Sequence, residues 1–326
     1  PLWSRGLGDV YKRQVLIIIE VIFYVLRLYR KASMKQIFTL ILPMVLGACA
    51  GGGGSSTSNS STPTTSPFSS WSSTVVGSPV NFTSGASASL LADGSYSQGI
   101  SDAAASLSLS TSNTFSSISA SNSSGSTSFS AANGDTLQSG FNGATTVGLN
   151  KAQTTVGSFA NPSYFGFEYQ TFGAWGSYGN ATGPAYAVSV GNPSPASAIP
   201  PVGSLTFTGG STGYYVDPSR FGYVTNANMV AVVTFDNRTV VFNTTNTTVL
   251  GGPGSNILSA PALNLTGNLS YAAGTNAMSG TATTSNGMSG NINGKFYGPG
   301  LNEIGGTYAV TGSGAGSMVG GFGGKR

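Results

Sequence analysis

Apolar and polar residues alternate with a period of two along most of the chain after residue 78. Leu107 and Leu109 alternate with serines, the pattern returns at 127–129, and it strengthens from about residue 164 onwards. Because no 3.6-residue period accompanies it, this alternation predicts strands with one buried and one wet face. The alternative for residues 95–130 is a disordered serine-rich stalk, since low hydrophobicity alone can prevent folding.

The C-terminal part of the chain predicts a closed antiparallel sheet. Short apolar runs are separated by Gly, Asn or Pro, and Asp236-Asn237 marks a tight hairpin. The 48 glycines suit the kinks and bulges of a strongly curved sheet. About eight such strands close into a barrel that is filled by side chains or holds one small ligand. We therefore predict an all-β fold with a roughly eight-stranded antiparallel barrel. The expected strands cover 164–175, 184–190, 203–208, 229–235, 238–243, 263–269, 277–283, 287–297, 304–310 and 318–322.

A short apolar run ends at the only cysteine of the chain. Residues 34–48 start with Met and Lys, continue with an apolar stretch and end in small residues, which is the layout of a signal peptide. The segment Leu46-Gly47-Ala48-Cys49 resembles a bacterial lipobox. The resemblance implies that Cys49 carries lipid, including palmitate, and Ala50 after it favours the outer membrane. A chance small-small-Cys sequence is the alternative, but Cys49 has no disulfide partner.

Two further stretches near the beginning predict no folded domain. Residues 1–33 are set aside as not native, because 3–14 resembles translated adapter sequence; a genuine N-terminal membrane helix is the alternative. Residues 49–77 consist almost entirely of Gly, Ser, Thr, Asn and Pro and predict a flexible tether.

The basic character of the whole chain comes from its first residues. Seven of the 13 basic and two of the nine acidic groups precede Cys49, which leaves six basic and seven acidic groups from there on, a net charge of −1. A chain without a basic patch is a poor ligand for polyanions. We therefore expect no nucleic-acid partner.

Two C-terminal segments carry a family resemblance. The first is 192–209 with Gly213-Tyr214 after it, and Phe172-Gly-Ala-Trp175 adds an aromatic strand. The residues that carry the second are Phe296, Tyr297, Gly298, Pro299, Glu303, Gly305 and Gly306. Together they resemble the C-terminal barrel of the transferrin-binding protein B-like surface lipoproteins, with Trp175 on the strand that opens that barrel.

The resemblance implies a domain order and a location. The barrel would cover 161–326, a Ser/Gly/Ala-rich β handle region would cover 78–160, and the protein would be displayed on the outer membrane of a Gram-negative bacterium. Members of this family capture host proteins such as transferrin or complement factor H, and some bind haem. This chain has room for one handle and one barrel, whereas the full receptor has two of each.

No ligand-binding residue follows from the resemblance, because the loops that contact transferrin have no recognisable counterpart here. The sequence leaves haem binding open and otherwise predicts no cofactor. Without histidine, a haem ligand would have to be Tyr or Met, and the candidates are Tyr214, Tyr215 and Met229.

The residues that most enzymes use are missing from this chain. It has no histidine and one cysteine, which excludes Ser-His-Asp triads, His-ligated zinc and iron, and disulfides. Gly209–Gly213 fits a G-x-S-x-G pattern, but without histidine it is interpreted as a turn. Glu303 is expected to be structural, accepting hydrogen bonds from loop amides or pairing with Arg238 or Lys295. We predict neither a catalytic residue nor a metal site.

Three hypotheses about function follow. The first is a non-enzymatic surface lipoprotein that is held in the membrane at Cys49 and binds a protein or small-molecule ligand. The second is a structural or adhesive surface protein in which the Ser-rich β region makes the contact. The third, least favoured, is a hydrolase that uses carboxylates or a Ser-Lys pair around Lys151 or Lys295.

Overall fold

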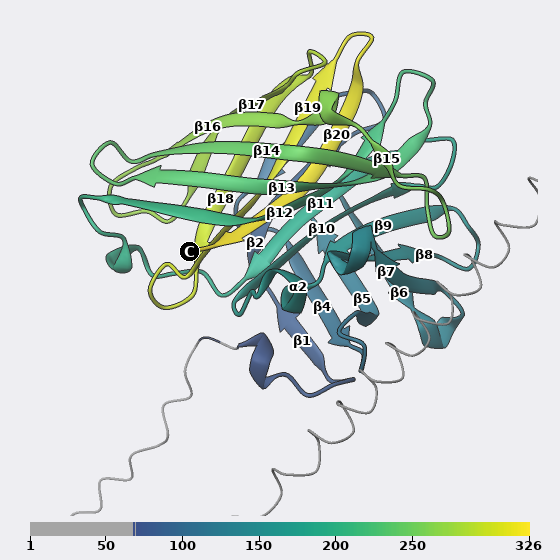
Figure 1. The fold of residues 1–326 in the computed structure, drawn as a ribbon, viewed down its shortest axis with the longest axis horizontal. Coiled ribbons are helices and arrows are strands. Elements are labelled where there is room, and N and C mark those ends of the chain that lie inside the picture. Colours follow the sequence, from purple (N-terminus) through teal and green to yellow (C-terminus); the bar gives the residue numbers. More distant parts are fainter. Residues whose placement is uncertain (1–67, 69) are drawn as a thin grey trace, which may run out of the picture. The chain divides into compact units, whose positions relative to one another are not determined.

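The computed structural model describes residues 68 and 70–326, which lie in one compact unit made almost entirely of strands (Figure 1). The all-β prediction is confirmed. The predicted signal peptide, the lipobox at 46–49 and most of the predicted tether lie outside the described residues. Single turns of helix join some strands: η1 (Trp71–Ser73), η2 (Ala131–Asn133), η3 (Phe141–Gly143), α2 (Pro162–Phe165), η4 (Ala196–Ala198) and η5 (Pro261–Leu263).

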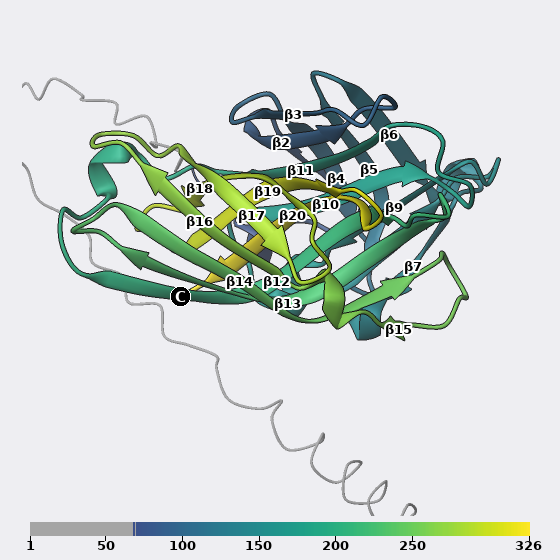
Figure 2. The same cartoon turned by 90° about the horizontal axis from the view of Figure 1, so that it is seen from above.

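Eight antiparallel strands of the C-terminal part close into a barrel (Figures 1 and 2). Each strand pairs with its neighbour in the sheet, and the pairing of β13 with β14 closes the ring. The predicted eight-stranded barrel is therefore confirmed. Its strands are β12 (Ser204–Val216), β13 (Gly222–Thr234), β14 (Thr239–Leu250), β16 (Leu265–Tyr271), β17 (Met278–Thr284), β18 (Ser289–Tyr297), β19 (Glu303–Gly312) and β20 (Gly316–Lys325), with the short β15 (Leu258–Ser259) added beside β14.

Side chains fill the barrel interior. Alternate residues of each strand point inwards, as a pleated strand requires. The inward-facing set is aromatic and methionine-rich, and Phe242 and Phe322 meet across the core with ring centroids 4.6 Å apart. Its largest other members are Phe207, Met229, Phe235, Tyr271, Met278, Met288, Phe296, Tyr308 and Met318.

Two further sheets precede the barrel in the sequence. The four-stranded sheet has the order β1 (Pro79–Phe82), β4 (Ala104–Leu109), β5 (Phe115–Asn122), β6 (Gly125–Ser130). The seven-stranded sheet has the order β3 (Tyr96–Gly99), β2 (Gly85–Leu90), β11 (Ala185–Gly191), β10 (Gln170–Ser177), β9 (Thr155–Ala160), β8 (Thr145–Leu149), β7 (Thr136–Gly140). Residues 95–130 thus form β3 to β6, and the alternative of a disordered stalk is wrong.

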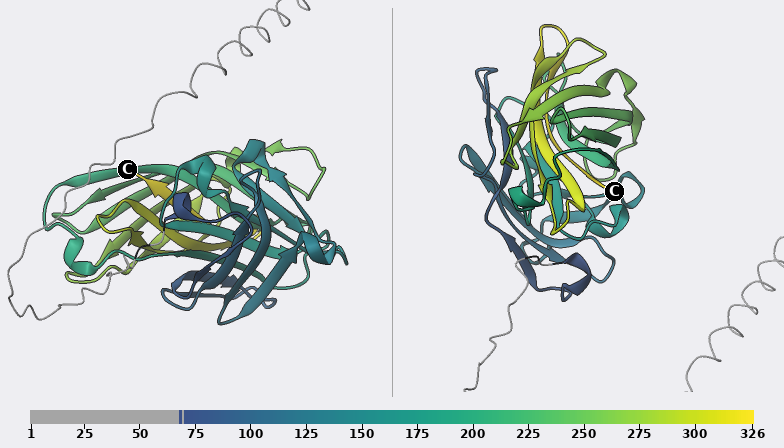
Figure 3. Two further views of the ribbon diagram at one scale, coloured as in Figure 1. Left: turned by 90° about the horizontal axis from the view of Figure 1, so that it is seen from below. Right: turned by 90° about the vertical axis from the view of Figure 1, so that its left-hand side faces the viewer.

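The seven-stranded sheet lies between the four-stranded sheet and the barrel, as the right-hand view of Figure 3 shows. Towards the four-stranded sheet it presents Phe159 and Trp175, which pack with Leu107, Ile118 and Phe129. Towards the barrel it presents small residues that pack with barrel residues of the same kind. These include Ala174 and Ala187 on the sheet, and Ala309 and Val319 on the barrel.

Glycine allows the barrel to approach this sheet closely. A Cβ atom on Gly321 would lie 2.8 Å from both the Phe172 Cβ and the Val188 carbonyl oxygen. Only a residue without a side chain fits there. The close approach leaves β10 buried on both faces.

Two expectations from the sequence are corrected here. The segment Phe172–Trp175 lies in β10 of the seven-stranded sheet and does not open the barrel, whose first strand is β12. The sequence pattern of an aromatic strand that is buried on both faces is the same whether the strand belongs to the barrel or to the seven-stranded sheet. Gly209–Gly213 is the middle of β12 and not a turn, because its glycines let strands meet closely: a Cβ on Gly209 would lie 2.1 Å from the Gly323 oxygen.

The barrel has two ends that carry different turns. We call the end with the β13–β14, β16–β17 and β18–β19 turns the near end, and the end with the β12–β13, β17–β18 and β19–β20 turns the far end. Among residues 68 and 70–326, no helix combines the length and the apolar character that crossing a bilayer requires.

Candidate functional site

The motif segment of the resemblance forms the end of β18, the near-end turn and the start of β19. Phe296 points into the barrel, where its ring lies 6.0 Å from that of Phe207. Tyr297 is on the opposite face of the strand, and its hydroxyl donates a 3.1 Å hydrogen bond to the Ser189 carbonyl of the seven-stranded sheet. Burial raises the pKa of the Tyr297 phenol. Gly298, with φ 83°, starts the turn in a left-handed conformation that suits glycine.

Glu303 joins the barrel to the segment that leads into β10. Its side chain is 2% exposed, and its carboxylate accepts hydrogen bonds from the backbone N–H groups of Glu168 and Tyr169. Burial raises the pKa of this carboxyl to about 7, although the amide donors act in the opposite direction. Of the two roles expected for Glu303, the hydrogen bonds to loop amides are present.

Lys295 has a different partner. Its ammonium group donates a 2.9 Å hydrogen bond to the Ser101 hydroxyl, and burial lowers its pKa. On the same face of β18, the Asn293 amide donates to the Gly99 carbonyl at 2.8 Å. The outward face of β18 therefore attaches the barrel to the seven-stranded sheet and the loop after β3. Of the Ser-Lys pairs considered for a hydrolase, the contact between Ser101 and Lys295 is present.

The first described residues are fastened at the near end. The Trp71 indole N–H donates to the Gln170 carbonyl at 2.8 Å, and the Trp71 backbone N–H donates to the Glu168 carbonyl at 3.0 Å. The chain thus enters the folded unit beside Glu303. The predicted lipid attachment site, Cys49, and the lipobox residues Leu46, Gly47 and Ala48 lie outside the described residues.

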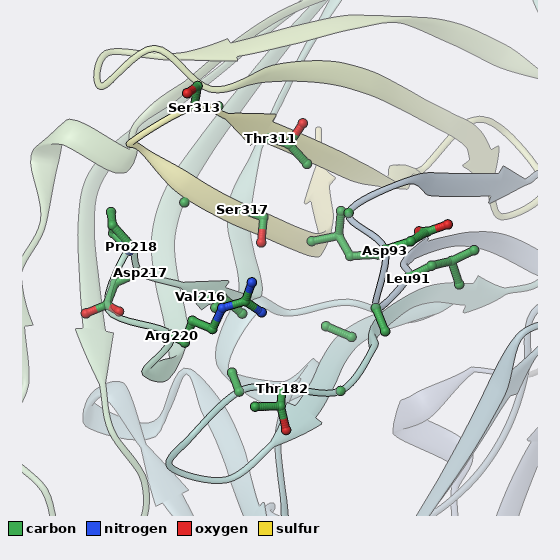
Figure 4. A pocket seen from close by; sticks show the side chains of 18 of the residues that line it. Leu91, Asp93, Thr182, Val216, Asp217, Pro218, Arg220, Thr311, Ser313 and Ser317 are labelled. Carbon is green, nitrogen blue, oxygen red and sulfur yellow. The ribbon is translucent and has the colours of Figure 1, made fainter.

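A cleft of about 530 Å³ opens at the far end, between the seven-stranded sheet and the barrel (Figure 4). Four connections line it: the β2–β3 turn, the β10–β11 loop, the β12–β13 turn and the β19–β20 turn. We call it the far-end cleft. The residues labelled in Figure 4 are Leu91, Asp93, Thr182, Val216, Asp217, Pro218, Arg220, Thr311, Ser313 and Ser317.

The acidic and basic side chains of the far-end cleft differ in how they are held. Asp217 accepts a 2.8 Å hydrogen bond from the Phe221 N–H, and Asp93 accepts one of 2.9 Å from the Ser95 N–H. The hydrogen bonds from Ser95 hold the pKa of Asp93 below its usual value. Arg220 points its guanidinium towards the hollow in Figure 4. Both carboxylates thus cap their own turns, whereas the guanidinium faces open space.

Backbone contacts hold the walls of the far-end cleft in place. The Ala181 N–H donates to the Arg220 carbonyl at 2.8 Å, and the Gly222 N–H donates to the Gly179 carbonyl at 2.9 Å. Asn180 and Phe221 form an isolated antiparallel bridge between the same two segments. The β10–β11 loop and the β12–β13 turn are therefore joined as in a sheet, and Arg220 is held there with φ 65°.

The tyrosines and the methionine considered as haem ligands do not fit a haem. Met229 faces the filled barrel interior, and the Tyr215 hydroxyl donates to the Ala315 carbonyl at 3.0 Å. Tyr214 packs between the barrel and the seven-stranded sheet, and its hydroxyl donates to the Ser177 carbonyl. All three side chains thus make contacts within the described part of the protein. In the described part of the chain, no group of three or more His, Cys, Asp or Glu residues is placed to hold a metal ion.

Sequence reasoning did not find the far-end cleft. Its lining comes from four connections between residues 90 and 317, and each of them looks like an ordinary polar turn by itself. Arg220 gives no local signal in the sequence, because its left-handed backbone, with φ 65°, is seen only in the structure.

Residues 199–326 match the family described as the C-lobe and N-lobe beta barrels of Tf-binding protein B. The match covers the loop before β12 and the whole barrel. This part of the chain is similar to the barrels of transferrin-binding protein B. The resemblance seen in the motif segment is thereby confirmed at the level of the fold. No curated protein is similar enough in sequence to match the chain.

Several solved structures are similar to part of this chain. A mutant transferrin-binding protein B from Haemophilus parasuis is 16% identical, with 73% of this chain and 44% of that chain covered and a TM-score of 0.44. Transferrin-binding protein B from Neisseria meningitidis is 13% identical, with 74% and 43% covered and a TM-score of 0.40. The N-lobe domain of lactoferrin-binding protein B from Moraxella bovis is 12% identical, with 59% and 78% covered and a TM-score of 0.31. The chain thus spans less than half the length of the first two.

Proposed function

We propose that this protein is a non-enzymatic surface lipoprotein, anchored through Cys49, that binds its ligand at the far-end cleft. The observation that carries the proposal is the position of that cleft, at the end of the barrel opposite to Trp71 and Glu303, where the chain from Cys49 enters. The part of the predicted tether between Cys49 and Phe68, about 20 residues, would have an r.m.s. reach of roughly 25 Å if it behaves as a flexible chain. An anchor there would leave the far end facing away from the membrane.

We propose a protein as the ligand class. The far-end cleft is open and lined by turns, polar groups and a few apolar side chains, which is the surface that a loop of another protein can contact. Arg220 would supply a charge-assisted hydrogen bond to a carboxylate of that loop. The names of the similar structures, transferrin-binding and lactoferrin-binding proteins, supply the first candidates.

The anchor is tested by lipid labelling. In a Gram-negative host that expresses the full chain, we expect labelled palmitate to enter the wild type and not the Cys49→Ala variant, because only the thiolate accepts the diacylglyceryl group. The wild type should fractionate with the outer membrane, and the variant should be soluble. One acyl chain gives only marginal membrane binding, whereas a lipobox cysteine carries several. We therefore expect the wild type to be found entirely in the membrane fraction. Absence of label from the wild type, with a control lipoprotein labelled in the same cells, would exclude the anchor.

The binding face is tested by a bulky substitution at each end of the barrel. Thr182 is exposed in the far-end cleft, and Thr239 is exposed at the near end, at the start of β14. On intact cells, we expect Thr182→Trp to reduce capture of transferrin or lactoferrin at least about tenfold, because an indole would fill the space a partner loop needs. Thr239→Trp should bind like the wild type. Equal capture by both variants would reject the far-end cleft as the binding face.

One observation favours the adhesive alternative. β6 is an edge strand of the four-stranded sheet, and Ser126 and Ser128 on it are exposed and uncharged. An unpaired edge of this kind can add a strand from another chain. This alternative predicts cell-to-surface contact that Thr182→Trp leaves unchanged and that Ser128→Pro on the edge strand removes, since proline cannot donate to an added strand.

A further inference from the structure

A second, smaller cavity lies at the near end of the barrel, away from the far-end cleft. It has a volume of about 140 Å³ and is lined by the loop before β12, the β13–β14 hairpin and the β16–β17 turn. We call it the near-end cavity. Its lining residues include Ile199, Pro200, Pro201, Phe235, Arg238 and Tyr271.

Tyr271 lines the near-end cavity, and its hydroxyl group lacks a hydrogen-bond partner among the described residues. The residue is 8% exposed, and its phenolic oxygen is buried without a hydrogen-bond partner among the described residues. A buried hydroxyl without a partner is costly, and native structures keep few of them. Burial raises the pKa of this phenol, and the charge of Arg238 acts on it in the opposite direction. Both residues line the near-end cavity. An acceptor between them would satisfy the hydroxyl.

Arg238 supplies the positive charge of the near-end cavity. It is exposed, and its backbone is held in the left-handed region with φ 54°. A non-glycine residue in such a conformation stores strain, which native proteins keep where function uses it. Glycine or asparagine would make the same hairpin at lower cost. The turn alone therefore does not explain an arginine at this position.

The walls of the near-end cavity are fixed before any ligand arrives. The Phe235 N–H donates to the Gly203 carbonyl at 2.8 Å, and the Gly203 N–H donates to the Asp236 carboxylate at 2.9 Å. The Tyr271 N–H donates to the Arg238 carbonyl at 3.2 Å. These hydrogen bonds hold the loop before β12, the β13–β14 hairpin and the end of β16 together.

We propose that the near-end cavity binds a short-chain carboxylate. The Arg238 guanidinium and the Tyr271 hydroxyl would donate to the two carboxylate oxygens, and the alkyl end would pack against Ile199 and Pro200. A volume of about 140 Å³ leaves room for an acid of the size of propionate. A guanidinium with a second donor recognises the planar anion better than a spherical or neutral ligand.

The proposal is tested on the full chain in detergent by titration with sodium propionate, followed by calorimetry or by broadening of the propionate NMR signals. We expect saturable binding at one site, and no binding of propionamide, which has the same shape without the charge. Arg238→Gln should weaken propionate binding at least about tenfold, the loss expected for a charge-assisted hydrogen bond. Lys151→Gln is the matched control, because Lys151 is also an exposed basic residue but lies in the turn between β8 and β9 and lines neither the near-end cavity nor the far-end cleft.

Tyr271→Phe separates a binding role from a structural one. The hydroxyl has no hydrogen-bond partner among residues 68 and 70–326, so its removal should leave the unfolding midpoint unchanged or raise it, while propionate binding falls several-fold. Equal affinity for propionate and propionamide, equal affinity for inorganic phosphate, or wild-type affinity in Arg238→Gln would each overturn the proposal. Absence of any saturable propionate binding to the wild type would do the same.

Discussion

Replacing Gly306 by alanine is expected to destabilise the barrel by about 3 kcal/mol or more. A Cβ atom at this position would lie 1.9 Å from the Asn293 carbonyl oxygen and 2.7 Å from the Gly294 Cα, both on the paired strand β18. The same atom would lie 2.6 Å from the Phe322 ring in the filled interior. Backbone atoms on a paired strand have little room to retreat, so the two strands must separate, and overpacking of this kind costs about 1–3 kcal/mol or more.

Gly300 provides the matched control for this substitution. It belongs to the same motif turn, its φ is not positive, and the nearest atoms to an added Cβ are 3.7 and 3.8 Å away, on the side chains of Arg326 and Asn302. Gly300→Ala should change the free energy of unfolding by less than about 0.5 kcal/mol. The measurement is the urea midpoint of both variants at an unchanged slope. If Gly306→Ala unfolds at the midpoint of Gly300→Ala, the close approach of β18 and β19 does not constrain the residue.

The sequence predicted the barrel because its signals are local. Alternation of apolar residues, the Asp236-Asn237 hairpin and frequent glycines each report on a strand or its ends, and together they indicate a curved antiparallel sheet. Assignment of strands to sheets is a different problem. Phe172–Trp175 was expected to open the barrel, but β10 is covered on both faces, and its pattern does not reveal which sheet it joins.

The candidate sites were mostly beyond sequence reasoning, because distant turns build them. Asp93 and Arg220 line the same cleft although 127 positions separate them, and neither has a motif around it. Glu303 was expected to be structural from its scarcity among the acids and its place in the motif. Its partners are two backbone N–H groups next to β10. The sequence could not predict them, because almost every residue type offers a backbone N–H group.

Glu303 is expected to make the folded unit less stable as the pH rises through 7. Burial raises its pKa from 4.5 to about 7, so between these values the folded state holds a proton that the unfolded chain has released. The stabilisation is fully present below about pH 4.5 and is lost as the pH rises through about 7. At about 1.4 kcal/mol for each pKa unit, the loss amounts to roughly 3 kcal/mol. The remaining described acids with a resolved shift, Asp93 and Asp102, have lowered pKa values and titrate below this window.

Urea unfolding of the wild type and of Glu303→Gln between pH 4.5 and 8 measures this effect. We expect the midpoint of the wild type to fall over that range and the midpoint of Glu303→Gln to stay level, because a glutamine does not titrate. Glu168→Gln is the control: the charge of Glu168 contributes to the raised pKa of Glu303, so its removal should move the fall to lower pH without abolishing it. The quantity compared is how the urea midpoint changes with pH. A glutamine that fits the two amide donors poorly would lower the midpoint at every pH, and it would leave the dependence on pH readable. If the urea midpoint of Glu303→Gln falls with pH as steeply as that of the wild type, a group other than Glu303 binds the proton.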